Sequence, residues 1–463
     1  MNSRRDQVQA HAYVVGRLTS ALVHGEPDAP ESPMRRTNLG SFGGLLLGTL
    51  LVAAFLIWGL ISPSGRAAAL TPGELVIASE TGSRYIYARG ALHPVLNWSS
   101  AMLLLNGKPV SKSVPAASLA GVPQGQSLGI AGAPDSLPAA SAINKGFWLV
   151  CAESSGGHPV VSLTIGTHAA VASAPPDSAT VVQAPDGSQY LVYHGQRMRL
   201  DASWIRDALG LGRAPVVQVS AAWLNAVPVV ADLRPVTVAG RGHPGPTLGG
   251  QQSRIGQVLV EHNVGSASQL YLAVAGGVAP ISLTQAAVVL ADPATSAAYP
   301  KASVAPVPVT PAAITGSRVV SQSLPDGPGA PAAPPKGFTP AQGQVPCMDF
   351  PSSGRAVPTL VYAAPPTGSP PDLNMTGVTA SPESADLIKV VPGSGALLRP
   401  QVAPGTNGSS FFLVTDAGVK FPVPSATQVT ALGYRAGQAT RLPAALAGLL
   451  PTGPALNLPA MGG

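Results

Sequence analysis

Two short motifs in this 463-residue chain match reactive sites of known type. Residues 125–129 read GQSLG and fit G-x-S-x-G, in which a strand-to-helix turn exposes a nucleophilic serine. Here Ser127 stands in a glycine-rich stretch between Pro123 and Pro134, with no helix predicted behind it. We therefore interpret 125–129 as a loop and not as a hydrolase elbow.

Residues 240–245 read GRGHPG and fit the dinucleotide motif G-x-G-x-x-G. That motif needs a helix opening at its last glycine, so that backbone N–H groups meet a pyrophosphate. Pro244 and Pro246 remove donors at this place, which favours a loop. The sequence also lacks GxxxxGK[ST], so no P-loop nucleotide site is predicted.

Metal-binding patterns are also missing from the sequence. The eight His residues do not pair at ligand spacing, and there is no CxxC. Asp135, Asp177 and Asp186 each follow or neighbour proline or glycine, which is typical of turns. We therefore assign no catalytic, cofactor-binding or metal-binding residues and predict no cofactor.

The composition describes a folded, weakly charged chain. Charged residues make up 10% of it, against about 25% in typical domains. Glycine (52) and proline (49) are abundant, which predicts many loops, but the apolar content is too high for a disordered chain. The net charge of +6 is modest and forms no dense patch, so nucleic-acid binding is not predicted.

One uncharged apolar run, 39–62, is long enough to cross a bilayer as a helix. Arg35 and Arg36 precede it directly and Arg66 follows, so the excess of arginine predicts a cytoplasmic N-terminus. The alternative is a signal peptide cleaved near 67–69, but the segment ahead of the run is too long for that. Residues 1–38 would then be cytoplasmic, and 63–463 periplasmic.

Small residues recur along the predicted membrane helix. Gly40, Gly44 and Gly48 follow the GxxxGxxxG spacing, which lets two membrane helices approach closely. The alternative is that glycine is simply common in membrane helices. We predict helix packing at these three glycines.

The N-terminal segment reads as an amphipathic helix. Ser3 and Asp6 have the spacing of a helix start, and Gly25 marks its end. Its apolar stripe repeats every seven residues, at Val8, Val15 and Leu22. The stripe either packs on a partner protein or lies on the membrane lipid of the inner leaflet, and we favour the partner.

Four dispersed segments share one order of strand, turn glycine, second strand and capped helix. The turn glycines are Gly90, Gly195, Gly277 and Gly418, and the helix caps are Asn97, Asp201, Thr284 and Ser425. The helices stop at Gly107, Gly210, Pro293 and Gly433. An apolar strand precedes each unit, at 74–79, 180–184, 256–261 and 387–391.

These segments predict repeats at about 74–107, 180–210, 254–293 and 386–450. Their unequal spacing indicates separate modules and not a solenoid. The stretches between them carry further predicted strands at 147–152, 160–165, 216–221 and 359–362. We expect those strands to meet in a central module drawn from about 145–168, 214–240 and 345–363, and we interpret 301–345 as the clearest internal loop.

Cys151 and Cys347 both follow the membrane run. A compartment outside the cytoplasm permits a disulfide, and chain entropy gives roughly 5 kcal/mol as an upper figure for a closure of this length. Two unrelated buried thiols are the alternative. The predicted fold is thus α+β: a short cytoplasmic helix, one transmembrane helix, and a β-rich periplasmic part with four hairpin/helix repeats around a disulfide-tied central module.

The start SRRDQVQAHAYVVGRLTSALVHGEPD, the single span and the loop GIAGAPD at 129–135 resemble the EccB family of actinobacterial type VII (ESX) secretion systems. The resemblance covers the whole chain. It implies an inner-membrane complex with EccC, EccD and EccE, other copies of the chain itself, and a cytoplasmic segment placed against the other components. It also implies a central domain between the repeats, tied by the cysteine pair.

Two classes of function remain at this point. The first is a structural subunit of a secretion machine, which stabilises the translocation complex for protein export. The second is an enzyme on the periplasmic face, either an ATP hydrolase or a cell-wall hydrolase. Some family members carry an ATPase label, but no Walker A sequence supports it in this chain.

Overall fold

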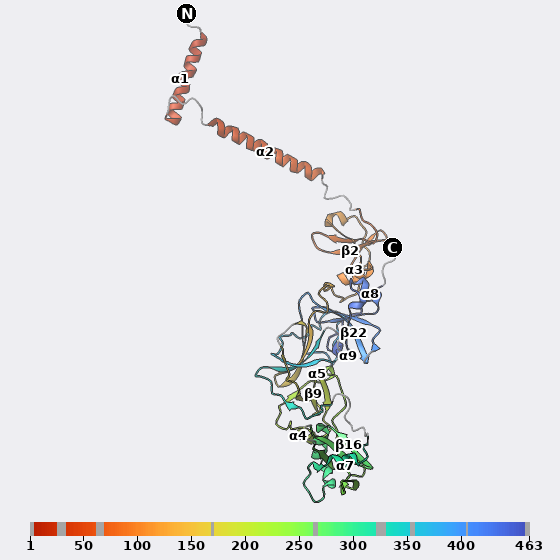
Figure 1. Ribbon diagram of the computed structural model, residues 1–463. Helices are drawn as coiled ribbons and strands as arrows, with labels where there is room; N and C mark the ends of the chain where they lie inside the picture. The colour runs from red at the N-terminus through yellow and green to blue at the C-terminus, as the bar shows by residue number, and fades with distance from the viewer. Residues whose placement is uncertain are drawn as a thin grey trace. The chain divides into compact units, whose positions relative to one another are not determined.

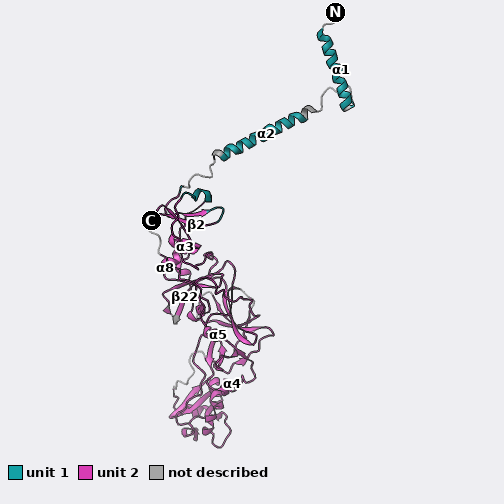
Figure 2. Cartoon of the chain, turned by 180° about the vertical axis from the view of Figure 1, so that it is seen from behind, with its two compact units in different colours: residues 1–69, 78–81, 114–121 teal, residues 70–77, 82–113, 122–463 magenta. Residues whose placement is uncertain are grey.

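The computed structural model describes residues 4–25, 34–61, 69–167, 171–262, 267–320, 330–351, 357–403 and 406–458. The chain divides into two compact units (Figure 2). The first comprises 1–69, 78–81 and 114–121, and the second comprises 70–77, 82–113 and 122–463.

The first unit holds the two long helices (Figure 1). Helix α1 (Arg4–His24) ends where Gly25 takes a positive φ of 71°, as the sequence predicts. Its predicted start at Ser3 lies outside the described residues. Helix α2 (Met34–Ile61) contains a 23-residue stretch, Thr37–Gly59, that is long and apolar enough to cross a membrane. The predicted span began at 39 and ended at Ser62, which is not described.

Four small sheets share one strand order, in which a hairpin is followed by the strand that precedes it in sequence and then by a later strand. Sheet 1 is β3-β2-β1-β4, formed by Ala91–Pro94, Arg84–Ala88, Leu75–Ala78 and Ser111–Val114. Sheet 2 is β10-β9-β8-β11, formed by Gln196–Arg199, Gln189–Tyr193, Ser178–Gln183 and Val216–Gln218. The short strand β18 (Lys336–Gly337) also pairs with β8.

Sheets 3 and 4 repeat this order. Sheet 3 is β16-β15-β14-β17, formed by Gly277–Ile281, Gln269–Val274, Val258–Glu261 and Val307–Val309. Sheet 4 is β25-β24-β22-β26, formed by Lys420–Val423, Phe411–Val414, Ala396–Ala403 and Thr440–Pro443, and β23 (Thr406–Asn407) also pairs with β22. In sheets 2, 3 and 4 the last strand runs parallel to its neighbour.

One helix follows each hairpin: α3 (Trp98–Leu104), α4 (Ser203–Ala208), α6 (Leu283–Ala291) and α8 (Ala426–Ala431). These helices pack in pairs: α3 lies on α8 (Figure 1), and α4 packs on α6. Further short helices follow later in the chain: η1 (Ala116–Leu119), α5 (Ala221–Ala226), η2 (Pro293–Ala298), α7 (Pro311–Thr315), η3 (Ala436–Gln438) and α9 (Ala444–Gly448). The element order therefore recurs at all four places, while the interpretation of the four as repeats, with the predicted bounds, stays a prediction.

A six-stranded central sheet has the order β21-β6-β5-β19-β20-β7. Its strands are Leu387–Val390, His158–Thr167, Phe147–Ser155, Val345–Pro351, Thr359–Ala363 and Ala172–Ser173. One face belongs to the largest core, to which sheets 2 and 4 also contribute. Trp223 of α5 is fully buried there and donates its indole N–H to the Val150 carbonyl of β5 at 3.1 Å.

Some predicted strands take other places than expected. The strand predicted at 216–221 is β11, which pairs with β8 of sheet 2 and not with the central sheet. The strand predicted at 387–391 is β21, which joins the central sheet beside β6, while β22 fills the expected place in sheet 4. The segment 301–345 is not only loop, because it contains β17, α7 and β18.

Two helix caps and one turn glycine also differ from the prediction. Asn97 and Ser425 cap α3 and α8, but Ala202 stands at the start of α4 in place of Asp201. Ser282, and not Thr284, caps α6, in a capping box with Gln285. The turn glycine of the third hairpin is Gly276, with φ 83°, and not Gly277. Helix α6 ends at Ala291, and Pro293 instead opens η2.

Candidate functional site

The serine motif at 125–129 does not form a nucleophile elbow. Gln124 and Leu128 make bridges beside strand β3, and the described chain contains no helix between 122 and 144. Gly125 lies against the His93 ring, where an added Cβ would come within 2.3 Å of a ring carbon. The loop that the sequence predicts is confirmed, and its glycine serves close packing.

The glycines at 240–245 also serve packing, and the loop leads into strand β12 (Pro244–Leu248), not into a helix. β12 pairs with β13 (Gln251–Arg254) in a separate hairpin. Gly240 and Gly242 have φ values of 74° and 83°. A Cβ on Gly242 would lie 2.7 Å from the Ala297 carbonyl oxygen.

The loop at 240–245 places Arg241 in a buried ion pair. Its Nη1 lies 2.7 Å from Asp292 Oδ2, and the two side chains are 12% and 11% exposed. The same Nη1 donates to Thr295 Oγ1 at 2.9 Å, and Nη2 donates to the Val236 carbonyl. Asp292 also accepts from the Ala294 N–H at 2.9 Å, at the start of η2. Arg241 therefore ties the loop to the helical turn that follows α6.

Among the residues that the structure describes, no three His, Cys, Asp or Glu side chains gather as a metal site. Asp186 forms a local turn, accepting from the Ser188 N–H at 2.9 Å. This hydrogen bond lowers the pKa of the Asp186 carboxyl. Asp349 on β19 is half-buried, and burial raises its pKa. Among the described residues, it belongs to no group of His, Cys, Asp or Glu side chains that could hold a metal ion.

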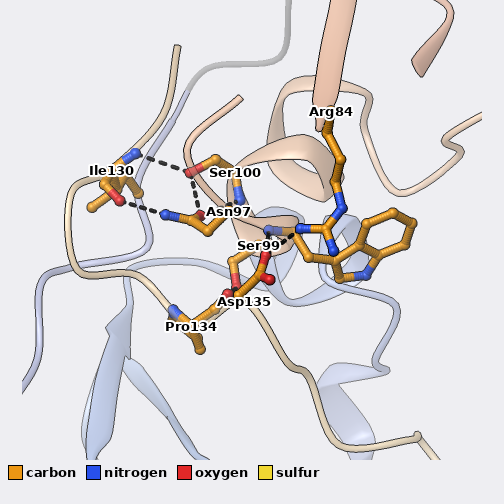
Figure 3. Close-up of polar contacts among 8 residues, drawn as sticks. Arg84, Asn97, Ser99, Ser100, Ile130, Pro134 and Asp135 are labelled. Carbon is orange, nitrogen blue, oxygen red and sulfur yellow. Dashed lines mark hydrogen bonds and ion pairs between the residues drawn. The ribbon is translucent and has the colours of Figure 1, made fainter. Parts of the chain in front are cut away.

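The loop 129–135 clasps the start of helix α3 (Figure 3). Asn97 caps the helix by accepting from the Ser100 N–H at 3.0 Å, and its Nδ2 donates to the Ile130 carbonyl at 2.7 Å. Ser100 Oγ donates to Asn97 Oδ1 at 2.6 Å and accepts from the Ile130 N–H at 2.9 Å. Three residues thus satisfy one another's polar groups in a place that is largely closed to water.

Asp135 completes this clasp from its far end (Figure 3). Its Oδ1 accepts from the Trp98 N–H at 2.7 Å and forms an ion pair with Arg84. The Arg84 guanidinium also lies 5.7 Å from the centre of a Trp98 ring. A carboxylate at the first turn of a helix is favoured by the helix dipole. Asp135 is therefore a structural residue, as its predicted turn role suggests, but its partners are distant in sequence.

The clasp also joins sheet 1 to sheet 4. Gly132 has φ 78°, and an added Cβ would lie 1.8 Å from the Thr376 carbonyl oxygen. Ala133 is buried in a core shared with Leu103 of α3 and Phe421 of β25. The sequence did not predict this contact of the 129–135 loop, although the cap residue Asn97, to which the loop binds, was predicted.

Cys151 and Cys347 face each other across β5 and β19 and form a disulfide. Their Cα atoms are 4.0 Å apart, and neither residue is exposed. The two cysteines are 196 positions apart, and sheets 2 and 3 lie between them in sequence.

The predicted partner-binding residues are exposed along the two long helices. Val8, Val15 and Leu22 of α1 are 67%, 48% and 82% exposed. Gly40, Gly44 and Gly48 of α2 have no atom within 4 Å of an added Cβ. The structure holds no partner chain, so their contacts stay predictions.

A family model described as "Type VII secretion system ESX-1, transport TM domain B" matches residues 2–461. The chain is 28% identical over 298 residues to the ESX-3 secretion system ATPase EccB3 of Mycolicibacterium smegmatis, covering 61% of this chain and 56% of that protein. It is 30% identical over 299 residues to the ESX-2 secretion system ATPase EccB2 of Mycobacterium tuberculosis, covering 60% and 57%. The chain thus matches little more than half the length of these relatives.

Two solved structures share the fold. A chain of an intact ESX-5 inner membrane complex matches with a TM-score of 0.63 and 23% identity, over 99% of this chain and 94% of that one. The EccB3 dimer from an ESX-3 core complex matches with a TM-score of 0.65 and 24% identity, over 82% and 98%. With the family model covering nearly every residue, the chain belongs to the EccB family of type VII secretion proteins.

Proposed function

We propose that this chain is a structural subunit of a type VII secretion membrane complex that helps to assemble and stabilise the machine for protein export. The observation that carries the proposal is the family match over residues 2–461. A single apolar helix before a large β-rich part suits a subunit that anchors in the inner membrane and fills space on one side of it. The partners proposed are EccC, EccD and EccE type components and further copies of this chain.

The proposed orientation places 1–38 in the cytoplasm, 39–62 in the membrane and 63–463 in the periplasm. The arginines before the span support it. A reporter that is active only after export should be active when fused after Gly463 and silent when inserted after Gly25. The reverse pattern would overturn the orientation.

The proposed contacts are the α1 stripe for a cytoplasmic partner surface and the α2 glycines for a second membrane helix. Most of a helix's stability in a protein comes from packing of its apolar face. The stripe of α1 is exposed, so we expect a docked surface to stabilise it. Purifying the tagged chain in mild detergent and identifying its companions tests the proposal. Recovery of the chain alone, from cells that contain the other components, would refute it.

An ATP hydrolase is the second candidate, because both curated relatives carry ATPase in their names. This chain has no GxxxxGK[ST] sequence, so hydrolysis would need another kind of nucleotide site. Phosphate release by the purified chain that persists after removal of all companions would favour this candidate.

A further inference from the structure

Each of the four hairpins is closed by a later segment with the same backbone geometry. These closing segments are 123–125, 228–230, 318–320 and 451–453. In each, the first carbonyl accepts from one hairpin residue and the third N–H donates back to the same residue, at 2.8–3.0 Å. Those hairpin residues are Leu92, Arg197, Val278 and Lys420, and their bridge partners are Gln124, Val229, Val319 and Thr452.

This geometry turns the middle residue of each closing segment outward. Successive residues of an extended chain direct their N–H and C=O groups to opposite sides. Because the flanking residues face the hairpin, the N–H and C=O of the middle residue face away from it. Each closing segment therefore presents one outward donor and one outward acceptor.

In sheet 4 the chain itself fills this outer edge. Thr379 donates its N–H to the Thr452 carbonyl at 2.9 Å, and Thr452 donates back at 2.8 Å, as an antiparallel bridge. Val378, the preceding residue, is buried in the core beneath sheet 4. The occupant is thus a bridge at Thr379, just after a turn in which Gly377 has φ 74°. The surrounding stretch, Thr-Gly-Val-Thr-Ala at 376–380, is made of small and β-branched residues.

In sheets 2 and 3 the equivalent edge is open. The backbone N–H and C=O of Val229 and Val319 have no partner among the described residues. Their side chains are 65% and 56% exposed, although valine is usually buried. Pro228 lacks an N–H group, but this does not block the outer edge, because its carbonyl binds Arg197 of strand β10 and its backbone is turned inward. An unpaired edge of this kind is a template for a further strand.

We propose that Val229 and Val319 are docking edges for an extended segment of a partner protein, which adds as an antiparallel strand. The occupant of the matching edge in sheet 4 defines its chemistry: an uncharged stretch of small and β-branched residues. Main-chain pairing would supply the affinity and the exposed valines the side-chain contact. This inference rests on the proposed function, because the partner is expected within the membrane complex.

Hydrogen exchange of single backbone amides tests the inference. In the isolated full-length chain, the Val229 and Val319 amides should exchange quickly, while the Thr452 amide is slow. In the purified complex, the two valine amides should slow by at least about tenfold, because hydrogen-bonded amides exchange through opening. An assembled complex in which both valine amides still exchange quickly would overturn the inference and leave the proposed function intact.

A synthetic peptide with the sequence of residues 375–381 allows a second experiment that does not need the complex. In excess, it should protect both valine amides of the isolated chain. Val229→Pro with Val319→Pro removes both outward donors and should abolish binding of the peptide, measured directly by calorimetry, whereas the matched pair Val229→Thr and Val319→Thr should keep it. If the proline variant misfolds, the native chain and the threonine variant still test the inference. It is refuted if residues 229 and 319 gain no amide protection, either from the peptide or in the complex.

Discussion

Replacing Arg241 by alanine should destabilise sheet 3 strongly. The change leaves Asp292 as a buried carboxylate without its cation, with only 11% of its side chain exposed. Removing one partner of a buried ion pair typically costs about 3–5 kcal/mol, since the remaining charge is uncompensated. The bonds to Thr295 and Val236 are lost as well. The expected loss is large against a domain stability of about 5–15 kcal/mol.

The matched control is Arg234→Ala. Arg234 also makes ion pairs, at 3.6 Å with Asp201 and 3.2 Å with Asp232, but its side chain is 58% exposed. Exposed pairs contribute about 0–1 kcal/mol, because water screens them and the side chains lose entropy. The two variants remove the same side chain and differ mainly in burial.

The assay is denaturant-dependent hydrogen exchange of amides in sheet 3 and in the central sheet. The cores of sheet 3 are made only of residues from 236–320. The loss of stability caused by Arg241→Ala should therefore stay within this sheet. Arg241→Ala should lower the opening free energy of sheet 3 by about 3–5 kcal/mol and that of the central sheet far less. Equal effects of Arg241→Ala and Arg234→Ala would refute the reasoning from burial.

Three further predictions can be checked on the purified chain or complex. Gly132→Ala should lower the unfolding midpoint, since its Cβ would meet a backbone oxygen at 1.8 Å. Gly437→Ala, whose Cβ meets no atom within 4 Å, should not lower it. Equal midpoints would contradict the proposed close packing of the 129–135 loop. Burial lowers the pKa of Lys420 from 10.5 to about 8, so between these values the unfolded chain binds more protons and stability should rise with pH. Lys420→Met should remove that rise, and an unchanged pH dependence would contradict it. Val15→Asp should release the chain from its complex and stop export, because a docked charge is costly, whereas Gln9→Ala should not; retention of the Asp variant would move membrane lipid ahead as the surface for α1.

Local order could be predicted from the sequence because its signals are local. Turn glycines and cap residues act over three or four positions, and they located the four hairpins and the helix after each hairpin to within a few residues, but not α5, α7 or α9. The errors arise where several cap-type residues stand together. At α6 both Ser282 and Thr284 are candidates, and only Gln285, three residues after Ser282, distinguishes them through the capping box.

Strand pairing and buried polar contacts could not be predicted in the same way. β21 and β22 are both apolar strands close in sequence, and only long-range pairing assigns one to the central sheet and the other to sheet 4. Arg241 and Asp292 are 51 positions apart, as are Arg84 and Asp135. No periodicity in the sequence links such pairs. The stretch 240–245, which resembles a dinucleotide motif, therefore gave no sign that Arg241 forms a buried ion pair.

The position of the disulfide follows from this long-range topology. Sheets 2 and 3 form an insertion between β6 and β19, and the chain leaves the insertion near where it enters, because Lys336 pairs with Ser178. The contact between β5 and β19 therefore closes a very long loop, which costs more chain entropy than any hairpin. A covalent bond between Cys151 and Cys347 removes much of that cost from the unfolded state, by up to roughly 5 kcal/mol on the chain-entropy account. The bond thus stabilises the central sheet at a pair of strands that lie far apart in sequence.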